Sequence, residues 1–284
     1  MIREAWAVGR FVLAHPVGRR RPVRCLLDTL LWQLRASARP RIVPFAGDAR
    51  LWARRGETGV TGNVYVGLHE FAEMAFTLHV LRPGDLFADI GANAGSYTVL
   101  AAKIARARVV AVEPVPEAVR RLSANVALNG VIDRVVVHRV AVSDREGTVR
   151  LATEFDTMNR ILAENEAGGI EVPCTTLDRL FAGEPPLLVK IDVEGHEDSV
   201  FAGARGSLAS GRVRAWIVET TRPGGRAARL LSENGYEPVD YDPFARSLRP
   251  CPPRPGNLIW VRDRGEVERR LRAASPVAVK GLRI

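Results

Sequence analysis

The amino-acid sequence predicts a doubly wound α/β fold, because short apolar segments alternate with segments of helical periodicity along most of the chain. Some apolar runs, such as Leu187-Leu188-Val189, are continuous, as expected for strands buried on both faces of a parallel sheet. A glycine-rich turn follows the first strand of the series, and sheets of this kind bind ligands at such turns. With 284 residues, the chain is long enough for one large domain with two short terminal additions.

Residues 1–55 are predicted to form a basic N-terminal arm that carries the entire charge excess. The arm holds twelve arginines and three acids, a net charge of +9, whereas residues 56–284 sum to zero. Leucines at helical spacing within residues 23–37 predict an amphipathic helix flanked by arginines. This helix packs on the main domain or makes a peripheral membrane contact. The positive charge of the arm suits phosphate, an anionic membrane surface or an acidic partner, but a general preference of the chain for arginine explains it more simply. We do not expect nucleic acid as the partner.

The main domain is predicted over residues 56–263, with seven strands. They are Leu86–Ile90, Val109–Val112, Val135–Val142, Leu187–Ile191, Ala215–Val218, Pro238–Tyr241 and Leu258–Val261. The helices predicted between them are Tyr97–Ala105, Glu117–Asn129, His196–Ala209 and Arg226–Asn234. No helix separates the last two strands, so we expect an antiparallel C-terminal hairpin at the edge of a mostly parallel, Rossmann-like sheet. A short charged helix and a tail are predicted for residues 264–284.

The cysteines and the N-terminus indicate the cellular compartment. Cys25, Cys174 and Cys251 are widely separated and form no CxxC pair, which argues against a disulfide framework or a zinc knuckle. The apolar stretch from Ala5 to Ala14 contains Arg10 and lacks a cleavage pattern, so we expect neither a signal peptide nor a transmembrane helix. The expected location is cytoplasmic.

The turn after the first strand reads DIGANAG and differs from known nucleotide-binding fingerprints. Asn93 and Ser96 break the GxGxxG pattern, and the GK-Ser/Thr end of a Walker loop is absent. Asp89 precedes the first glycine by two residues, and a carboxylate there suits a ligand that carries an ammonium group. Glu113 ends the next strand, where an acid can bind both hydroxyls of a ribose. A ribose joined to an amino acid indicates S-adenosylmethionine.

The chain resembles the FkbM family of class I methyltransferases over roughly residues 56–263. The resemblance rests on DIGANAGSYT (89–98), AVEPVPEAVRRLSANVALNG (111–130), AVSD (141–144) and VKIDVEGHED (189–198). It implies an S-adenosylmethionine-dependent O-methyltransferase that acts on a hydroxyl of a sugar, a glycolipid or another secondary metabolite. The residues that it implies for the cofactor are Asp89, Gly91, Asn93 and Gly95 for the methionine part, Glu113 for the ribose, and Ala141, Val142 and Ser143 for the adenine.

A second group of acids follows the buried strand at Leu187–Ile191. Asp192 and Glu194 lie two residues apart, His196 opens the next helix, and Glu219 ends the following strand. An alcohol holds its proton with a pKa of ~15.7, so methyl transfer to oxygen needs a base or a metal ion. Asp192 or His196 is the candidate base. Alternatively, Asp192, Glu194 and Glu219 bind Mg²⁺, which prefers oxygen ligands.

Two other functions remain open at this point. One is an RNA methyltransferase, suggested by the arginine-rich arm, although the arm has few aromatic residues to stack on bases. The other is a non-catalytic module that binds nucleic acid or a membrane through residues 1–55. Substrate specificity is expected in the segment from Glu154 to Gly169 and in the approach from Tyr65 to Glu73, whose Glu70 and Glu73 could reach the cofactor.

Overall fold

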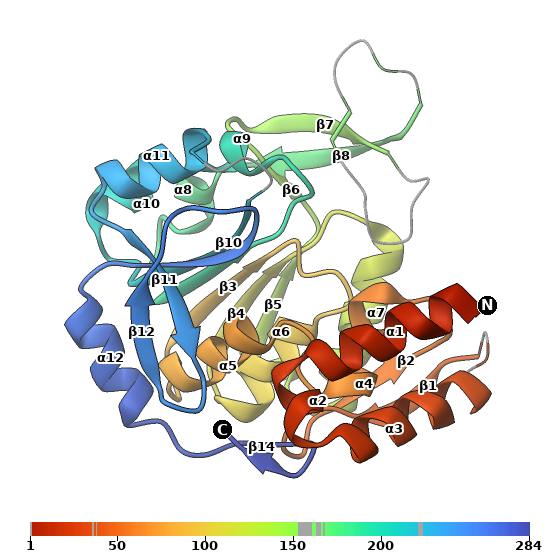
Figure 1. Ribbon diagram of the computed structural model, residues 1–284. Helices are drawn as coiled ribbons and strands as arrows, with labels where there is room; N and C mark the ends of the chain where they lie inside the picture. The colour runs from red at the N-terminus through yellow and green to blue at the C-terminus, as the bar shows by residue number, and fades with distance from the viewer. Residues whose placement is uncertain are drawn as a thin grey trace.

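The computed structural model describes residues 2–35, 37, 39–152, 161–162, 166, 168–220 and 224–284. Its centre is an eight-stranded sheet between two layers of helices (Figure 1). In order across the sheet, the strands are β12 (Ser247–Pro250), β11 (Glu237–Asp242), β13 (Gly256–Val261), β10 (Ala215–Thr220), β9 (Leu188–Ile191), β3 (Leu86–Ile90), β4 (Arg108–Val112) and β5 (Val135–His138). The strands from β10 to β5 are parallel, and β13 is antiparallel to both of its neighbours. The predicted doubly wound fold is confirmed.

The sheet has eight strands rather than the predicted seven. The additional strand, β12, ends at Pro250 within a proline-rich stretch that the sequence presents as a loop. An edge strand tolerates proline because one row of its backbone groups needs no partner.

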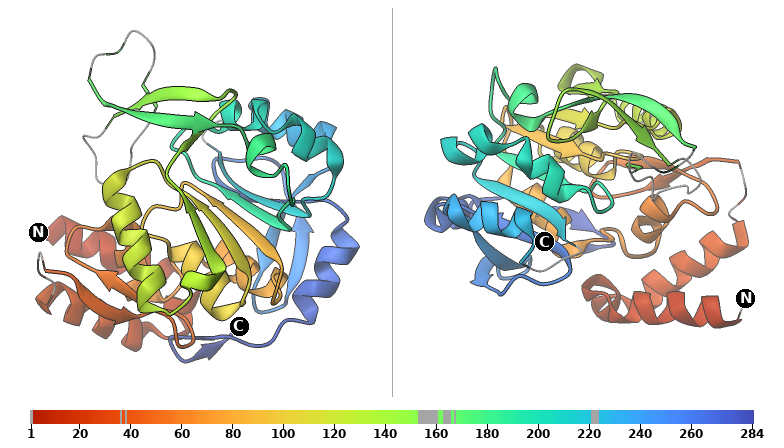
Figure 2. Two further views of the ribbon diagram at one scale, coloured as in Figure 1. Left: turned by 180° about the vertical axis from the view of Figure 1, so that it is seen from behind. Right: turned by 90° about the horizontal axis from the view of Figure 1, so that it is seen from above.

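The predicted strand Val135–Val142 is divided. Its first half is β5, and its end is β6 (Ala141–Val142), which pairs with β8 (Ile170–Thr175). β7 (Gly147–Leu151) completes this separate three-stranded sheet, which lies beyond the carboxyl ends of the central strands (Figures 1 and 2).

Alternate residues of the central strands enter two hydrophobic cores. Phe87 and Leu188 face one core, whereas Ala88 and Val189 face the other, as the period of two in a strand requires. The helices on the first face are α5 (Phe71–Val80), the π-helix η1 (Leu100–Ile104), α7 (Pro116–Leu128) and α12 (Arg264–Arg272). Those on the second face are α8 (Leu177–Leu180), α9 (Glu197–Ala202), α10 (Arg205–Ser210) and α11 (Arg226–Glu233). The predicted helix His196–Ala209 is thus divided into α9 and α10.

Three helices form the N-terminal arm: α1 (Ile2–Ala14), α2 (Pro16–Arg20) and α3 (Pro22–Arg35). A hairpin of β1 (Arg41–Pro44) and β2 (Arg50–Ala53), which the sequence analysis did not predict, joins them to α4 (Thr58–Val66). Asn125 Oδ1 of α7 accepts a hydrogen bond from the Trp52 backbone N–H at 2.7 Å. The arm is therefore fastened to the main domain through a buried polar contact.

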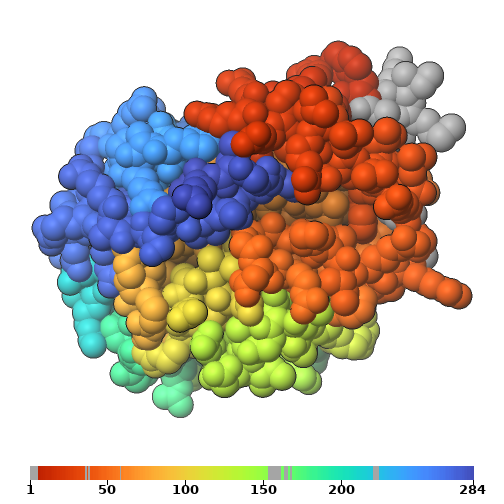
Figure 3. Space-filling model, turned by 90° about the horizontal axis from the view of Figure 1, so that it is seen from below, coloured from red at the N-terminus to blue at the C-terminus, as the bar shows by residue number. Residues whose placement is uncertain are grey.

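The C-terminal segment lies beside the N-terminal arm (Figure 3). The C-terminal hairpin of β14 (Ala278–Val279) and β15 (Leu282–Arg283) carries Lys280 in its turn. Lys280 Nζ donates a hydrogen bond to Asp28 of α3 at 2.7 Å. Within the part of the chain that is described, no helix has both the length and the apolar composition needed to cross a membrane.

Candidate active site

The main cavity lies where the winding of the sheet changes direction. From β3 the chain proceeds to β4 and β5 on one side, and later returns to β9 and β10 on the other side of β3. A cavity of about 300 Å³ opens at the carboxyl ends of these strands. Open α/β sheets bind their ligands at such a switch point, because the loops after adjacent strands diverge there.

The glycine turn after β3 forms the floor of the cavity. Gly91, Asn93 and Gly95 all have positive φ angles, of 77°, 48° and 85°. A Cβ atom on Gly91 would lie 1.8 Å from the carbonyl oxygen of Asp192. Glycine is thus required at position 91 by its backbone conformation and by the close approach of the chain after β9.

Glu113 braces this turn from the end of β4. Its Oε2 accepts a hydrogen bond from the Asn93 backbone N–H and its Oε1 accepts one from Val115, both at 2.9 Å. Burial raises the pKa of Glu113, and the two backbone donors oppose that rise. Each carboxylate oxygen keeps a free lone pair for a ligand hydroxyl.

Asp89 lies deeper, with 1% of its surface exposed, although it contributes to the cavity wall. Its Oδ2 accepts a hydrogen bond from Thr98 Oγ1 at 2.6 Å. Burial raises the pKa of Asp89, and the nearby positive charge of Lys190 opposes this effect. The carboxylate therefore already has a hydrogen-bond donor and a neighbouring cation.

The predicted adenine turn is only partly in the cavity. Ala141 and Val142 line the wall, but Ser143 does not. Ser143 Oγ lies 2.9 Å from His196 Nε2, and His196 is absent from the lining as well. Gly195, with a φ of 91°, turns the chain immediately before His196. Because of this turn, His196 contacts Ser143 instead of joining the acids, and burial lowers its pKa.

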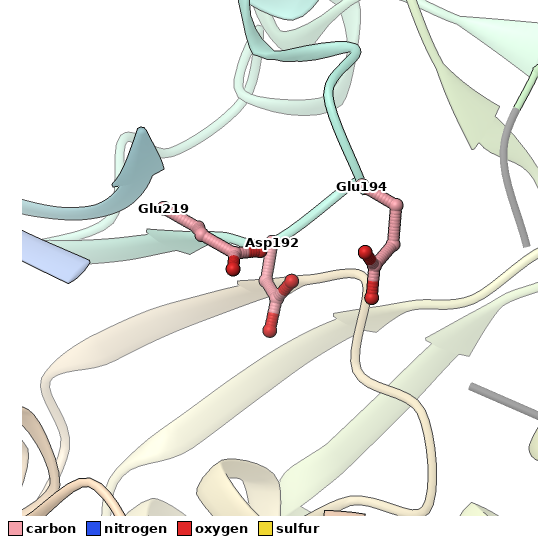
Figure 4. Close-up of side chains that lie close together, drawn as sticks. All are labelled: Asp192, Glu194 and Glu219. Atoms are coloured by element: carbon pink, nitrogen blue, oxygen red, sulfur yellow. The ribbon is translucent and has the colours of Figure 1, made fainter. Parts of the chain in front are cut away.

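The three predicted acids Asp192, Glu194 and Glu219 do meet at the cavity (Figure 4). One oxygen atom from each lies within 4.8 Å of the others. β9 ends at Ile191, so Asp192 and Glu194 follow the strand, and the rule that residues two apart in a strand share a face does not apply to them. Glu194 reaches the cluster through a left-handed backbone with a φ of 52°. Three carboxylates are a donor set that Mg²⁺ can accept.

Lys190 is the basic partner of this cluster. Its Nζ donates a hydrogen bond to Asp192 Oδ2 at 2.7 Å, and its side chain is 4% exposed. Burial by itself would lower the pKa of Lys190, but the surrounding carboxylates raise it, so the side chain remains an ammonium ion. The sequence signal for this role is the presence of lysine in a chain in which 38 of the 41 basic residues are arginine.

The pKa values of Asp192 and Glu219 are shifted in opposite directions. Burial would raise the pKa of Asp192, but the charge of Lys190 and hydrogen bonds from Glu219 and Lys190 lower it. Burial, together with the hydrogen bond to Asp192 and its charge, raises the pKa of Glu219 to about 8. At neutral pH the pair therefore carries one shared proton and one negative charge.

Glu70 and Tyr97 also line the cavity, and Tyr97 was missed in the sequence analysis. Tyr97 Oη donates a hydrogen bond to Glu70 Oε2 at 2.6 Å, and Lys190 Nζ lies 4.8 Å from the Tyr97 ring centre. Glu73, predicted alongside Glu70, is not in the lining. Most of the predicted specificity segment 154–169 lies outside the described residues, although Ile161 contributes to the wall.

The described wall of the cavity is predominantly acidic. Lys190 and His69 are its basic residues, against six acids: Glu70, Asp89, Glu113, Asp192, Glu194 and Glu219. A doubly wound domain with a glycine turn after one strand, an acid at the end of the next and further carboxylates at the switch point has the arrangement typical of a nucleotide-type cofactor site.

A family model described as "Methyltransferase FkbM domain" matches residues 89–238, which is more than half of the chain. The chain therefore belongs to the FkbM methyltransferase family and is an S-adenosylmethionine-dependent methyltransferase. The matched range contains the glycine turn, Glu113 and all three clustered acids. No curated protein sequence matches the chain.

Solved structures with similar folds include three methyltransferases. A precorrin-6y C5,15-methyltransferase from Geobacter metallireducens has 14% identity and a TM-score of 0.40, with 68% of this chain and 87% of that chain covered. An rRNA methylase from Streptococcus thermophilus has 12% identity and a TM-score of 0.40, with coverage of 67% and 93%. A SAM-dependent O-methyltransferase from Thermotoga maritima has 15% identity and a TM-score of 0.39, with coverage of 67% and 63%.

Proposed function

We propose that this methyltransferase transfers the methyl group to a hydroxyl of a sugar, a glycolipid or another secondary metabolite. The observation that carries the proposal is the group of Lys190, Asp192 and Glu219 at the cavity, directly beside the glycine turn. An oxygen acceptor needs a proton acceptor at the moment of attack, whereas an amine needs little help. A carboxylate pair with a neighbouring ammonium ion meets that requirement.

The cofactor is expected between the glycine turn and the acid at the end of β4. Asp89, Gly91 and Asn93 would hold its amino-acid part, and Glu113 its ribose; Gly95, predicted with them, completes the turn but does not line the cavity. Ala141 and Val142 would face the adenine. S-adenosylmethionine supplies a methyl group bound to a positively charged sulfur, for which the acidic wall is a favourable environment.

In this mechanism the ionised Asp192–Glu219 pair would accept the hydroxyl proton as the acceptor oxygen bonds to the methyl carbon, and the methyl–sulfur bond would break with its electron pair left on S-adenosylhomocysteine. Loss of the shared proton, with a pKa of about 8 at Glu219, generates the stronger base. Lys190 holds Asp192 at 2.7 Å and limits the motion of its carboxylate. The remaining contribution of the chain is to align the acceptor with the methyl group.

A Mg²⁺ ion at Asp192, Glu194 and Glu219 is the alternative way to activate a hydroxyl, and the three carboxylates fit this ion. However, Asp192 already accepts hydrogen bonds from the Lys190 ammonium and from Glu219. We therefore propose Lys190 as the cation at Asp192. Activity that persists after dialysis against EDTA agrees with this choice, and activity restored only by Mg²⁺ would reverse it.

The acidic wall supports a neutral acceptor over RNA, because a wall whose ionised groups are mostly carboxylates would repel a chain of phosphates. A non-catalytic module is disfavoured for a different reason: the acids at the ends of β3, β4, β9 and β10 are all in place around one cavity.

The direct test is methyl transfer from labelled S-adenosylmethionine to a panel of sugars, glycolipids and other hydroxylated metabolites, with RNA as the comparison. We expect labelled ether products, and we expect Asp192→Asn to lower kcat by about 10²- to 10⁴-fold, as for loss of a general base. Glu113→Gln is expected to weaken S-adenosylhomocysteine binding by calorimetry, while Asp192→Asn preserves it. Labelled RNA together with unlabelled hydroxyl acceptors would reject the proposed acceptor class.

A further inference from the structure

The outer surface of the N-terminal arm carries a stripe of exposed aliphatic side chains. On α3, Val23, Leu27, Leu30 and Leu34 are 69%, 51%, 54% and 73% exposed. Their spacing of four, three and four residues places them on one face of the helix. We call these four residues the leucine face.

The leucine face is not used to pack the fold. Cys25, Thr29 and Trp32, on the opposite side of α3, are buried. The helix is also held by Gln33, whose Nε2 donates a hydrogen bond to Tyr65 Oη of α4 at 2.6 Å. α3 therefore has two faces of different kind. Three buried residues pack it against the fold, and a second, apolar face is exposed to solvent.

This exposure is concentrated in one part of the described molecule. Eight of the twelve exposed large hydrophobic residues belong to α1 and α3. On the neighbouring α1, Trp6 and Leu13 are seven residues apart, and thus on one face, and are 64% and 48% exposed. Large exposed apolar side chains gathered on two packed helices mark an interaction site.

Arginines surround the apolar surface. The exposed arginines of the three helices are Arg10, Arg19, Arg20, Arg24 and Arg35, and Arg21 between α2 and α3 is exposed as well. The acids of these helices are Glu4 and Asp28, and Asp28 accepts a hydrogen bond from Lys280. The surface is therefore both apolar and strongly positive.

We propose that α1 and α3 dock the protein on an anionic lipid surface, with the leucine face inserted among the acyl chains and the arginines at the headgroups. A helix with an apolar face and arginine-rich flanks lies in the plane of a bilayer interface. Two copies of the chain would bring like charges together, because each surface is basic. A nucleic acid would leave the aliphatic side chains of the leucine face in water.

The helices that carry the exposed surface pack with their other sides near the cavity. Phe11 of α1 contacts His69 with ring centres 5.3 Å apart, and His69 lines the cavity. α4, which packs against α3, contributes Gly59 to the same wall.

The test is co-sedimentation of the full chain with vesicles of phosphatidylcholine alone or with 30% phosphatidylglycerol. We expect binding to the anionic vesicles only, weakened at high salt because phosphate and arginine charges are screened. Leu27→Glu/Leu30→Glu is expected to lower the partition coefficient at least tenfold. Val136→Glu is the matched control, since Val136 is 57% exposed on β5, outside the arm, and this variant should bind like the native chain.

S-adenosylhomocysteine binding by calorimetry verifies that each variant is folded, because Leu27, Leu30 and Val136 do not line the cavity. The proposal is overturned if the native chain stays in the supernatant, or if Leu27→Glu/Leu30→Glu binds anionic vesicles as the native chain does. A dimer in light scattering that this variant dissociates, without vesicle binding by the native chain, would assign the surface to a second copy. RNA binding without vesicle binding would likewise reject a lipid surface.

Discussion

Replacing Lys190 with methionine removes the buried cation of the acid cluster and keeps most of the side-chain volume. The ammonium group is 2.7 Å from Asp192 Oδ2, and the two side chains are 4% and 29% exposed. Asp89, which is 1% exposed, would also lose its neighbouring positive charge. Lys190→Met therefore leaves buried negative charge without compensation.

The magnitude follows from the burial of the two partners. Breaking a fully buried pair costs about 3–5 kcal/mol, whereas an exposed pair contributes about 0–1 kcal/mol. Because Lys190 is buried and Asp192 is partly exposed, we expect the free energy of unfolding to fall by about 2–4 kcal/mol. Lys103→Met is the control, because Lys103 pairs with Asp48, whose side chain is 73% exposed, and a loss below about 1 kcal/mol is expected.

The loss should depend on pH in a defined direction. The pKa of Asp192 is lowered in the fold, so its contribution is present above the unfolded value of about 3.9 and is lost as the pH falls through the lower folded value. The pKa of Lys190 is raised, so its contribution is present below the unfolded value of about 10.4 and is lost as the pH rises through the higher folded value. The difference between native chain and variant is therefore largest between about pH 4 and pH 10.

Urea unfolding of the native chain and Lys190→Met at pH 7 measures the lost free energy of unfolding, provided that the dependence of the free energy on urea concentration has the same slope in both. The same measurement at acidic pH tests whether the difference between the two chains becomes smaller. Lys190→Met/Asp192→Asn removes both charges and should recover more than half of the lost free energy. The reasoning is refuted if Lys190→Met is within about 0.5 kcal/mol of the native chain, or if the double variant is no more stable than the single one.

Three further outcomes test the site. With the native chain, kcat is expected to rise about tenfold per pH unit below about pH 8 and then level off, because Glu219 loses its proton there. Glu219→Gln should abolish this rise. If the pH profile of kcat is the same in this variant as in the native chain, the Asp192–Glu219 pair is not the base. Gly91→Ala should lower the free energy of unfolding in urea by about 2 kcal/mol or more. The loss should exceed that of Gly84→Ala, because Gly84 has a similar φ of 87° but open space around it. Equal losses would show that the close approach of the Asp192 carbonyl to Gly91 is unimportant. His196→Ala should cost about 1 kcal/mol through its lost contact with Ser143 while kcat stays within about threefold; a large drop in kcat would return His196 to the catalytic group.

Local patterns were sufficient for the parts of the fold that depend on neighbours in the chain. The strands Leu86–Ile90 and Leu188–Ile191 are mostly apolar because both of their faces are buried, so they could be recognised without a structure. β12 could not, because its pairing depends on β11 rather than on the composition of its own residues. The same is true of β6, whose partner β8 lies about thirty residues further along the chain.

For the site, the sequence by itself determined the residue types at the strand ends: the glycine turn, Glu113 and the three acids. These depend on backbone conformation and charge, which are encoded locally. Only the tertiary structure decided which of them meet. The insertion of β9 beside β3 brings Asp192 against Gly91 and under the ammonium of Lys190, while the turn at Gly195 carries His196 away to Ser143. The tertiary structure also decided that α3 packs through Cys25, Thr29 and Trp32. The face of a helix that becomes buried depends on the surface against which the helix packs.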